Sequence, residues 1–112
     1  MATRKLDKKE WKTFFDRISK IIEGKQAEIE VASLDLGDQV QAEWLPLYGI
    51  AYDPKDDLVE VILEGLDHMI AKPREIYAED GTAGLESVEV IDAEGIKQIV
   101  KLRDELVPLA LR

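Results

Sequence analysis

The only histidine of the chain, His68, is the residue best suited to acid–base chemistry, and an aspartate, Asp67, precedes it. Histidine titrates near neutral pH and can serve as a general base or a metal ligand. Neighbouring side chains on an extended strand point to opposite faces, so Asp67 is not expected to orient the imidazole ring. We therefore treat both residues as weak catalytic candidates. The alternative is a structural histidine whose ring nitrogen bonds a backbone carbonyl or a carboxylate at the Gly65 turn.

Other chemistry has little support in the sequence. The chain has no cysteine, which excludes a thiolate nucleophile, a disulfide and the usual cysteine-based zinc site. No serine or threonine lies in a nucleophile-elbow sequence. The acidic segment 53–57 lacks the oxygen ligand and the glycine that an EF-hand loop requires, so we predict that it forms a turn. We expect neither a metal ion nor a cofactor.

The composition favours one soluble domain over residues 1–112, because 46% of the residues are apolar and 35% are charged. The net charge of −9 is unevenly distributed: residues 1–26 carry eight Lys and Arg against four Asp and Glu, and the remainder is strongly acidic. An acidic body argues against binding to nucleic acid, which depends on neutralising phosphates. No apolar run is long enough for an export signal or a membrane span, so we expect a cytoplasmic protein without membrane contact.

One amphipathic helix is predicted near the N-terminus, because large apolar side chains recur at helical spacing. The apolar stripe consists of Trp11, Phe14, Phe15, Ile18, Ile21 and Ile22. Asp7 and Glu10 have the spacing of a capping box ahead of this stripe. Leu6 can pack on Trp11 as a hydrophobic staple, and Gly24 suits the left-handed residue that ends many helices. We expect the stripe to lie in the core.

After Gly24 the apolar period changes to two, which indicates strands. The first predicted hairpin pairs Leu36 with Val40, Leu34 with Ala42 and Ala32 with Trp44, around a loop of residues 37–39. A bulge or a twist is expected near residues 32–33, where the strand changes the face that it buries. The second predicted hairpin turns at residues 54–57 and pairs Tyr52 with Val59, Ile50 with Val61 and Tyr48 with Leu63.

The last third of the sequence is less regular. Pro73 argues against a central strand through residues 69–78 and favours an edge strand or an irregular crossing. A final hairpin is predicted to turn at residues 92–95, with Val88 opposite either Ile99 or Val100. The spacing of Ile96, Ile99 and Val100 would also suit a helical turn. The whole pattern predicts an α+β domain in which one N-terminal helix packs on a mostly antiparallel, meandering sheet of five to six strands.

Three stretches, "ASLDLGDQVQAEWLPLYGIAYDPKDD", "GLDHMIAKPREI" and "LESVEVIDAEG", together span much of this layout. With them the chain resembles a family of small bacterial proteins described only as a domain of unknown function. The resemblance implies a bacterial cytoplasmic setting. It implies no activity, cofactor or catalytic residue.

The stretch "WLPLYGIAY" is apolar on both phases of one strand, although a single helix can cover only one face of a small sheet. We expect this stretch to contact a protein partner or a second copy of the chain through Trp44, Leu45, Leu47, Tyr48, Ile50 and Tyr52. The competing interpretation is intramolecular: residues 73–78 and the C-terminal "LVPLALR" could fold over the same face.

Three functions from different classes fit these observations. The favoured one is a small acidic cytoplasmic protein that acts as a non-catalytic protein-interaction module, with a homodimer as one form. The second is a small-molecule binder or minor hydrolase that uses His68 with nearby acids. The third is an acidic decoy that mimics nucleic acid and occupies the groove of a basic protein. The absence of any coherent catalytic motif favours a protein that is not an enzyme.

Overall fold

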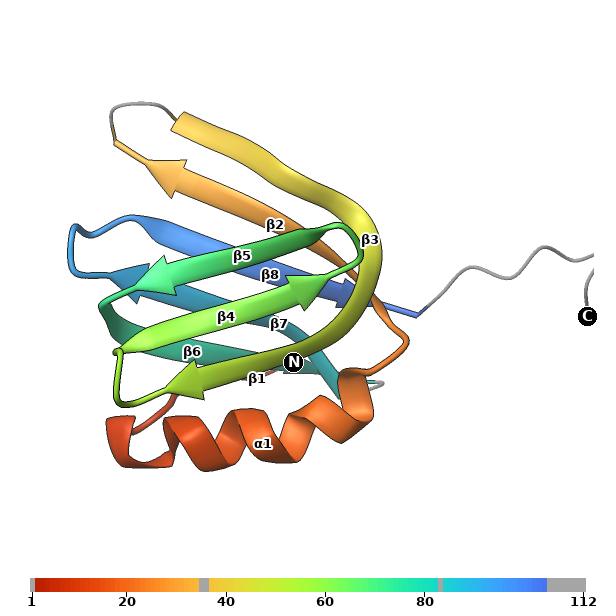
Figure 1. Cartoon of the computed structure of the whole chain (residues 1–112), viewed down its shortest axis with the longest axis horizontal. Helices are drawn as coiled ribbons and strands as arrows, with labels where there is room; N and C mark the ends of the chain where they lie inside the picture. The colour runs from red at the N-terminus through yellow and green to blue at the C-terminus, as the bar shows by residue number, and fades with distance from the viewer. Residues whose placement is uncertain (1, 35–36, 83, 105–112) are drawn as a thin grey trace, which may run out of the picture.

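A computed structural model of the chain describes residues 2–34, 37–82 and 84–104. Within these ranges an antiparallel eight-stranded sheet has the order β1-β6-β7-β8-β2-β3-β4-β5 and carries one α-helix, α1 (Figure 1). The strands are β1 (Ala2–Lys5), β2 (Gln26–Ser33), β3 (Gly37–Asp53), β4 (Leu58–Leu63), β5 (Leu66–Ala71), β6 (Pro73–Gly81), β7 (Gly84–Asp92) and β8 (Lys97–Arg103). The predicted α+β class is confirmed, but the prediction of five to six strands was wrong.

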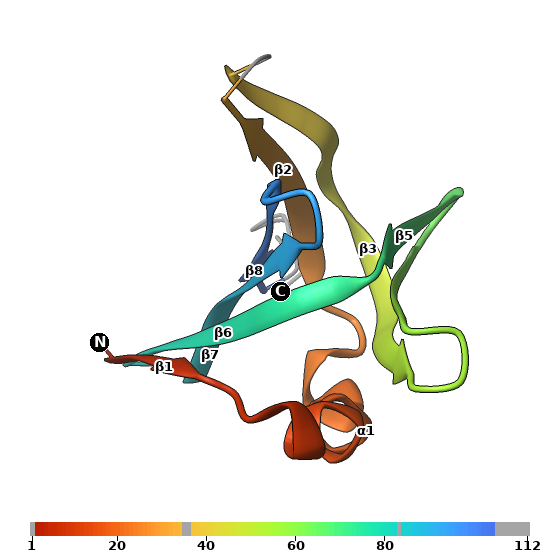
Figure 2. The same cartoon turned by 90° about the vertical axis from the view of Figure 1, so that its left-hand side faces the viewer.

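The sheet curls so strongly that its edge strand β5 approaches the start of β6. In Figure 2, β6, β7 and β8 lie on one side of the interior, β3 and β5 lie on the other, and α1 lies across one end. A one-residue connection at Lys72 joins β5 to β6, and the carbonyl of Lys72 accepts a hydrogen bond from the backbone N–H of Ala93 beside β7. The apolar core fills the space enclosed by this curved sheet and the helix.

Helix α1 (Trp11–Ile22) follows a short 3-10 turn, η1 (Lys8–Glu10). The predicted capping box is present, because the Asp7 backbone N–H donates to Glu10 Oε1 at 3.0 Å and the Asp7 carboxylate accepts from the turn. Gly24 ends the helical segment with a φ of 89°. The predicted stripe is buried at Trp11, Phe14, Phe15, Ile18 and Ile22. Ile21 is the exception, since 65% of its surface is exposed. At 12 residues α1 is too short to cross a bilayer, and the described ranges contain no other helix that could do so.

The predicted register of the β2–β3 hairpin was wrong. The observed pairs include Ser33–Gly37, Ala32–Asp38, Val31–Gln39, Glu30–Val40 and Ile29–Ala42. The prediction paired Leu34 and Leu36 with apolar residues, but Leu34 is exposed at the turn and Leu36 lies outside the described residues. The register is determined instead by the burial of Ala27 and Ile29, which lie in the N-terminal half of β2.

A face change in this hairpin does occur, but not at residues 32–33. The register shifts between Ala27 and Glu30, and the additional residues lie on β3. Trp44, within this irregular part of β3, has a φ of 49°, an uncommon value for a residue with a side chain. Bulges of this kind add twist, which helps β3 to pass from β2 on one side to β4 on the other.

The β3–β4 hairpin confirms two of its three predicted pairs, Tyr52 with Val59 and Ile50 with Val61. The third was wrong, because Leu63 pairs with Leu47 instead of Tyr48. The register shifts between Leu47 and Gly49, so Tyr48 is an additional residue. A second irregularity in β3 therefore removes this tyrosine from the core face.

Two predictions for the last third of the chain concern the strand that contains Pro73 and the register of the last hairpin. The prediction that no single strand runs through residues 69–78 is confirmed, because β5 ends at Ala71 and β6 begins at Pro73. The edge-strand alternative was wrong for β6, which pairs with β1 on one side and β7 on the other. Pro73 is tolerated because it occupies the first position of β6, beyond the part that pairs with β1. In the last hairpin Val88 pairs with Val100, which selects one of the two predicted registers.

Candidate functional site

The six residues predicted as an interface do not share one environment. Leu47, Ile50 and Tyr52 are buried in the core of their own chain, so they are not available as an exposed surface. Trp44 and Leu45 are half-buried, and the guanidinium carbon of Arg103 lies 4.1 Å from the centroid of the Trp44 ring. Of the six side chains, only that of Tyr48 is largely exposed, at 55%.

Helix α1 accounts for the burial of the C-terminal half of β3. Ser19 Oγ lies 3.0 Å from the carbonyl oxygen of Ile50 and 2.8 Å from that of Phe15, so its single proton joins the helix to the strand. The Trp11 ring meets the Tyr52 ring edge-on, with centroids 5.2 Å apart. Part of the expected cover is thus intramolecular and comes from α1, and Ile76 and Ala78 of the segment 73–78 belong to the same core cluster as Ile50. The C-terminal "LVPLALR" lies outside the described residues.

The outward face of β3, β4 and β5 carries a patch of apolar side chains. Cross-strand pairing places Gly49, Ile62 and Asp67 in one row and Ala51, Glu60 and Met69 in the next. Tyr48 adjoins the first row, and Ile62 and Met69 are 37% and 57% exposed. We call Tyr48, Gly49, Ala51, Ile62 and Met69 the Tyr48 face.

A groove of about 300 Å³ runs between this face and helix α1. Its strand side is formed by members of the Tyr48 face, and its helix side carries Asp16, Ser19, Lys20 and Glu23. Gly49 has no side-chain carbon and Ala51 has only a methyl group, so neither residue fills the groove. Asp16 is engaged by Lys12, with 2.8 Å between Nζ and Oδ2. Lys20 and Glu23 make no ion pair with the described residues.

Asp67 and His68 are not brought together. Asp67 lies on the outward face, where its hydrogen bond to Glu60 raises the pKa of the Glu60 carboxyl, with smaller contributions from burial and from the charges of Asp67 and Asp53. His68, the next residue on β5, has its partner on β8. This agrees with the expectation that alternation along a strand separates the two side chains.

His68 belongs to a hydrogen-bonded network with Gln98 and Asp92. His68 Nε2 lies 2.6 Å from Gln98 Oε1, and Gln98 Nε2 lies 3.3 Å from Asp92 Oδ2. Asp92 Oδ1 also accepts the backbone N–H groups of Glu94 and Ile96 at 2.9 and 3.1 Å, which fixes the β7–β8 turn. Asp92 and Gln98 are the buried polar residues of the described chain.

The network assigns the proton on the imidazole ring. A carboxylate only accepts, so the Gln98 amide nitrogen faces Asp92 and its oxygen faces His68. His68 Nε2 must then donate, so this ring nitrogen carries a proton. The expected partner at the Gly65 turn was wrong: the acceptor is a side-chain amide 30 residues along the chain. Gln98 and Asp92 were not among the predicted site residues, and no local spacing links them to His68.

Within the described ranges, no three or more His, Asp or Glu side chains are grouped as ligands of a metal ion.

Comparison with known proteins identifies the family. The chain belongs to the family of unknown function DUF5335, whose sequence profile matches residues 2–109. An uncharacterized protein of Aquifex aeolicus (strain VF5) is 39% identical over 104 residues, which cover 92% of this chain and 94% of that protein. No solved structure matches the chain. The expected resemblance to a bacterial family of unknown function is thus confirmed.

Proposed function

We propose that this member of the DUF5335 family is a small acidic cytoplasmic protein that acts as a non-catalytic interaction module, and that it pairs with a second copy through the Tyr48 face. The observation that carries this proposal is the exposure of Tyr48, Ile62 and Met69 on adjoining strands beside an open groove. Adjoining exposed apolar side chains are typical of contact surfaces, because burying them releases water.

The rim of the groove favours a second copy as the occupant. Lys20 and Glu23 lie on the helix side of the same groove and carry opposite charges without an ion-pair partner among the described residues. In a two-fold contact the same patch meets itself, so Lys20 of one copy can lie opposite Glu23 of the other. A patch that bears both signs is self-complementary, whereas a basic or acidic partner would be repelled by one of them.

The remaining features are consistent with this function. His68 Nε2 is bound to Gln98, so the histidine already has a structural task. The absence of cysteine suits a reducing compartment such as the cytoplasm.

Sedimentation velocity at micromolar concentration tests the proposal. The wild-type protein is expected to sediment with twice the 12.7 kDa mass of one chain. Tyr48→Glu and Ile62→Glu are each expected to give a folded monomer, because a buried unpaired charge is costly at an interface but not on a free surface. Ile21→Glu is the matched control, since Ile21 is an exposed apolar residue of α1 that does not line the groove.

A charge exchange tests the two-fold geometry. Lys20→Glu alone should weaken dimerisation by placing two acids together, and the double variant Lys20→Glu, Glu23→Lys should restore it. A wild-type monomer throughout the concentration range would refute self-association. A dimer that Tyr48→Glu leaves intact would refute the assigned face.

A further inference from the structure

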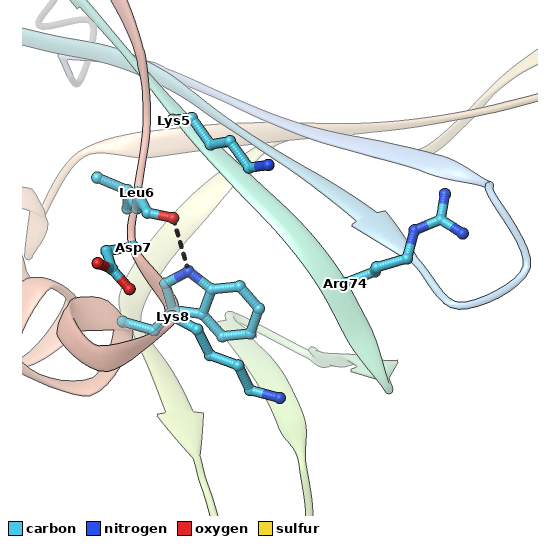
Figure 3. Close-up of a pocket in the computed structure, with 6 residues that line it drawn as sticks. Lys5, Leu6, Asp7, Lys8 and Arg74 are labelled. Atoms are coloured by element: carbon cyan, nitrogen blue, oxygen red, sulfur yellow. Dashed lines mark hydrogen bonds between the residues drawn. The ribbon is translucent and has the colours of Figure 1, made fainter.

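A second cavity, of about 420 Å³, lies at the start of the helical segment, away from the groove at the Tyr48 face. It is lined by Lys5, Leu6, Asp7, Lys8, Trp11 and Arg74. Figure 3 shows the side chains of Lys5, Lys8 and Arg74 arranged around it, with the Asp7 carboxylate pointing away from Arg74. Three cations thus surround one cavity in a chain whose net charge is −9.

The fold assembles this cluster from distant segments. Lys5 ends β1 and Lys8 begins η1, whereas Arg74 lies on β6. The pairing of Lys5 with Tyr77 brings the two segments together, and the backbone N–H of Leu6 donates to the carbonyl of Ile76 at 2.8 Å.

Arg74 occupies an irregular position in β6. The register with β7 passes from Pro73–Asp92 to Glu75–Ile91, so β7 offers no residue opposite Arg74. Such bulges redirect a side chain out of the regular alternation and are frequent beside binding sites. Here the bulge coincides with a guanidinium at the cavity edge.

The cations are only partly neutralised. Glu75 lies near two of them, 3.2 Å from Lys5 Nζ and 3.9 Å from Arg74 Nε, so one carboxylate serves two positive groups. Lys8 makes no ion pair with the described residues, and its Nζ lies 5.6 Å from the centroid of the Trp11 ring. The Asp7 carboxylate caps η1 and keeps its negative charge, so the six lining residues carry three positive charges and one negative charge.

We infer that this cavity binds a small soluble oxyanion with at least two negative charges, such as a phosphorylated or polycarboxylate metabolite. The cavity volume is in the range of small-molecule sites. Arg74 supplies a planar fork that matches phosphate or carboxylate oxygens, and Lys8 supplies a mobile point charge. The Trp11 indole, whose Nε1 donates to the Leu6 carbonyl at 3.4 Å, forms the apolar wall.

NMR titration with pyrophosphate, and separately with citrate, tests the inference at constant ionic strength. The chain has two tryptophans, so the indole N–H signals of Trp11 and Trp44 serve as probe and internal control, assigned with a Trp44→Phe variant. We expect a saturable shift of the Trp11 signal alone. Tighter binding of pyrophosphate would assign a phosphorylated ligand, and tighter binding of citrate a carboxylate ligand.

Two charge-neutralising variants locate the site. Lys8→Gln and Arg74→Gln should each weaken binding about tenfold, the usual effect of losing one charge-assisted hydrogen bond. Lys9→Gln is the matched control, because Lys9 belongs to the same turn but does not line the cavity. The inference is overturned if neither anion gives a saturable Trp11 shift, or if Lys9→Gln weakens binding as much as Lys8→Gln. These outcomes do not depend on self-association through the Tyr48 face.

Discussion

His68 Nε2 on β5 lies 2.6 Å from Gln98 Oε1 on β8, although three strands separate β5 from β8 in the sheet order. The contact crosses the inside of the curled sheet instead of following a backbone ladder. It therefore ties together two strands that do not pair with each other directly.

Removing this link should destabilise the fold. His68→Ala leaves the Gln98 amide oxygen without its donor, and we expect the free energy of unfolding to fall by about 1–3 kcal/mol. His68→Gln should lower the free energy of unfolding by less, because the new amide can still donate to the Gln98 amide oxygen. Urea denaturation measures both changes. Val40→Ala, at a 53% exposed position of β3 outside the Tyr48 face, is the control and should change stability by less than about 0.5 kcal/mol. Equal losses of unfolding free energy for His68→Ala and Val40→Ala would contradict a structural role for His68.

The helix stripe gives a second prediction. Phe15 is fully buried, so Phe15→Ala should cost about 3–5 kcal/mol of unfolding free energy through the cavity it leaves. Ile21→Ala on the same helix should cost less than about 0.5 kcal/mol, because most of the Ile21 side chain is already in water. Chemical denaturation measures the free energy of unfolding of both variants. A small loss of this free energy for Phe15→Ala would show that this helix face does not form the core.

Tyr52 should make stability sensitive to alkaline pH. Burial, with a 2.8 Å hydrogen bond to Asp57, raises the pKa of the Tyr52 phenol to about 12 from an ordinary value of 10.0. The fold therefore favours the neutral phenol, and this contribution is complete below about pH 10 and is lost as the pH rises through about 12.

Unfolding of wild type and Tyr52→Phe, followed over that pH range, measures this contribution. The variant should be less stable at neutral pH, because the hydrogen bond to Asp57 is missing. The stability difference should shrink between about pH 10 and 12. A difference that stays constant over this window would mean that Tyr52 does not titrate differently in the two states.

The Glu60–Asp67 pair predicts a stabilising substitution. The hydrogen bond to Asp67 raises the pKa of Glu60, so the stability that a shared proton provides is present in acid and is lost as the pH rises through the raised value. Glu60→Gln removes one charge and keeps a hydrogen-bond donor, so the melting temperature should rise at neutral pH and the gain should disappear in acid.

Glu43→Gln is the charge control for that substitution. It removes the same charge from an exposed position on β3, so it reports the general effect of lowering the net charge. If the melting temperature at neutral pH rises no more for Glu60→Gln than for Glu43→Gln, repulsion between Glu60 and Asp67 is contradicted.

Local signals in the sequence predicted local structure well. Three kinds of feature depend on residues close together in the chain: the capping box at Asp7, the end of the helix at Gly24, and the turns after Asp53 and Asp92. The β2–β3 register was wrong because bulges shift it between Ala27 and Glu30, and apolar matching does not detect an additional residue. Strand β1 was missed because all four of its residues are exposed and carry no alternating pattern.

The candidate sites were harder to predict, because their members meet only in the folded chain. The sequence identified His68 but not Gln98, which approaches it only when the sheet curls. It identified Tyr48 together with Leu47 and Ile50, because alternation alone cannot show that a bulge separates them. The basic cavity depends on Arg74, which the pairing of β1 with β6 carries to Lys5 and Lys8.

The strand order also constrains the route by which the chain folds. Five of the seven strand pairs join consecutive strands and can form as hairpins soon after their segments collapse. The other two, β1 with β6 and β2 with β8, join residues as far apart as Ala2 and Asp80 or Gln26 and Arg103. Closing such long loops costs entropy before any contact compensates for it, so these two pairings are expected to set the folding rate. Until β8 arrives, one edge of β2 stays unpaired and open to association with other chains.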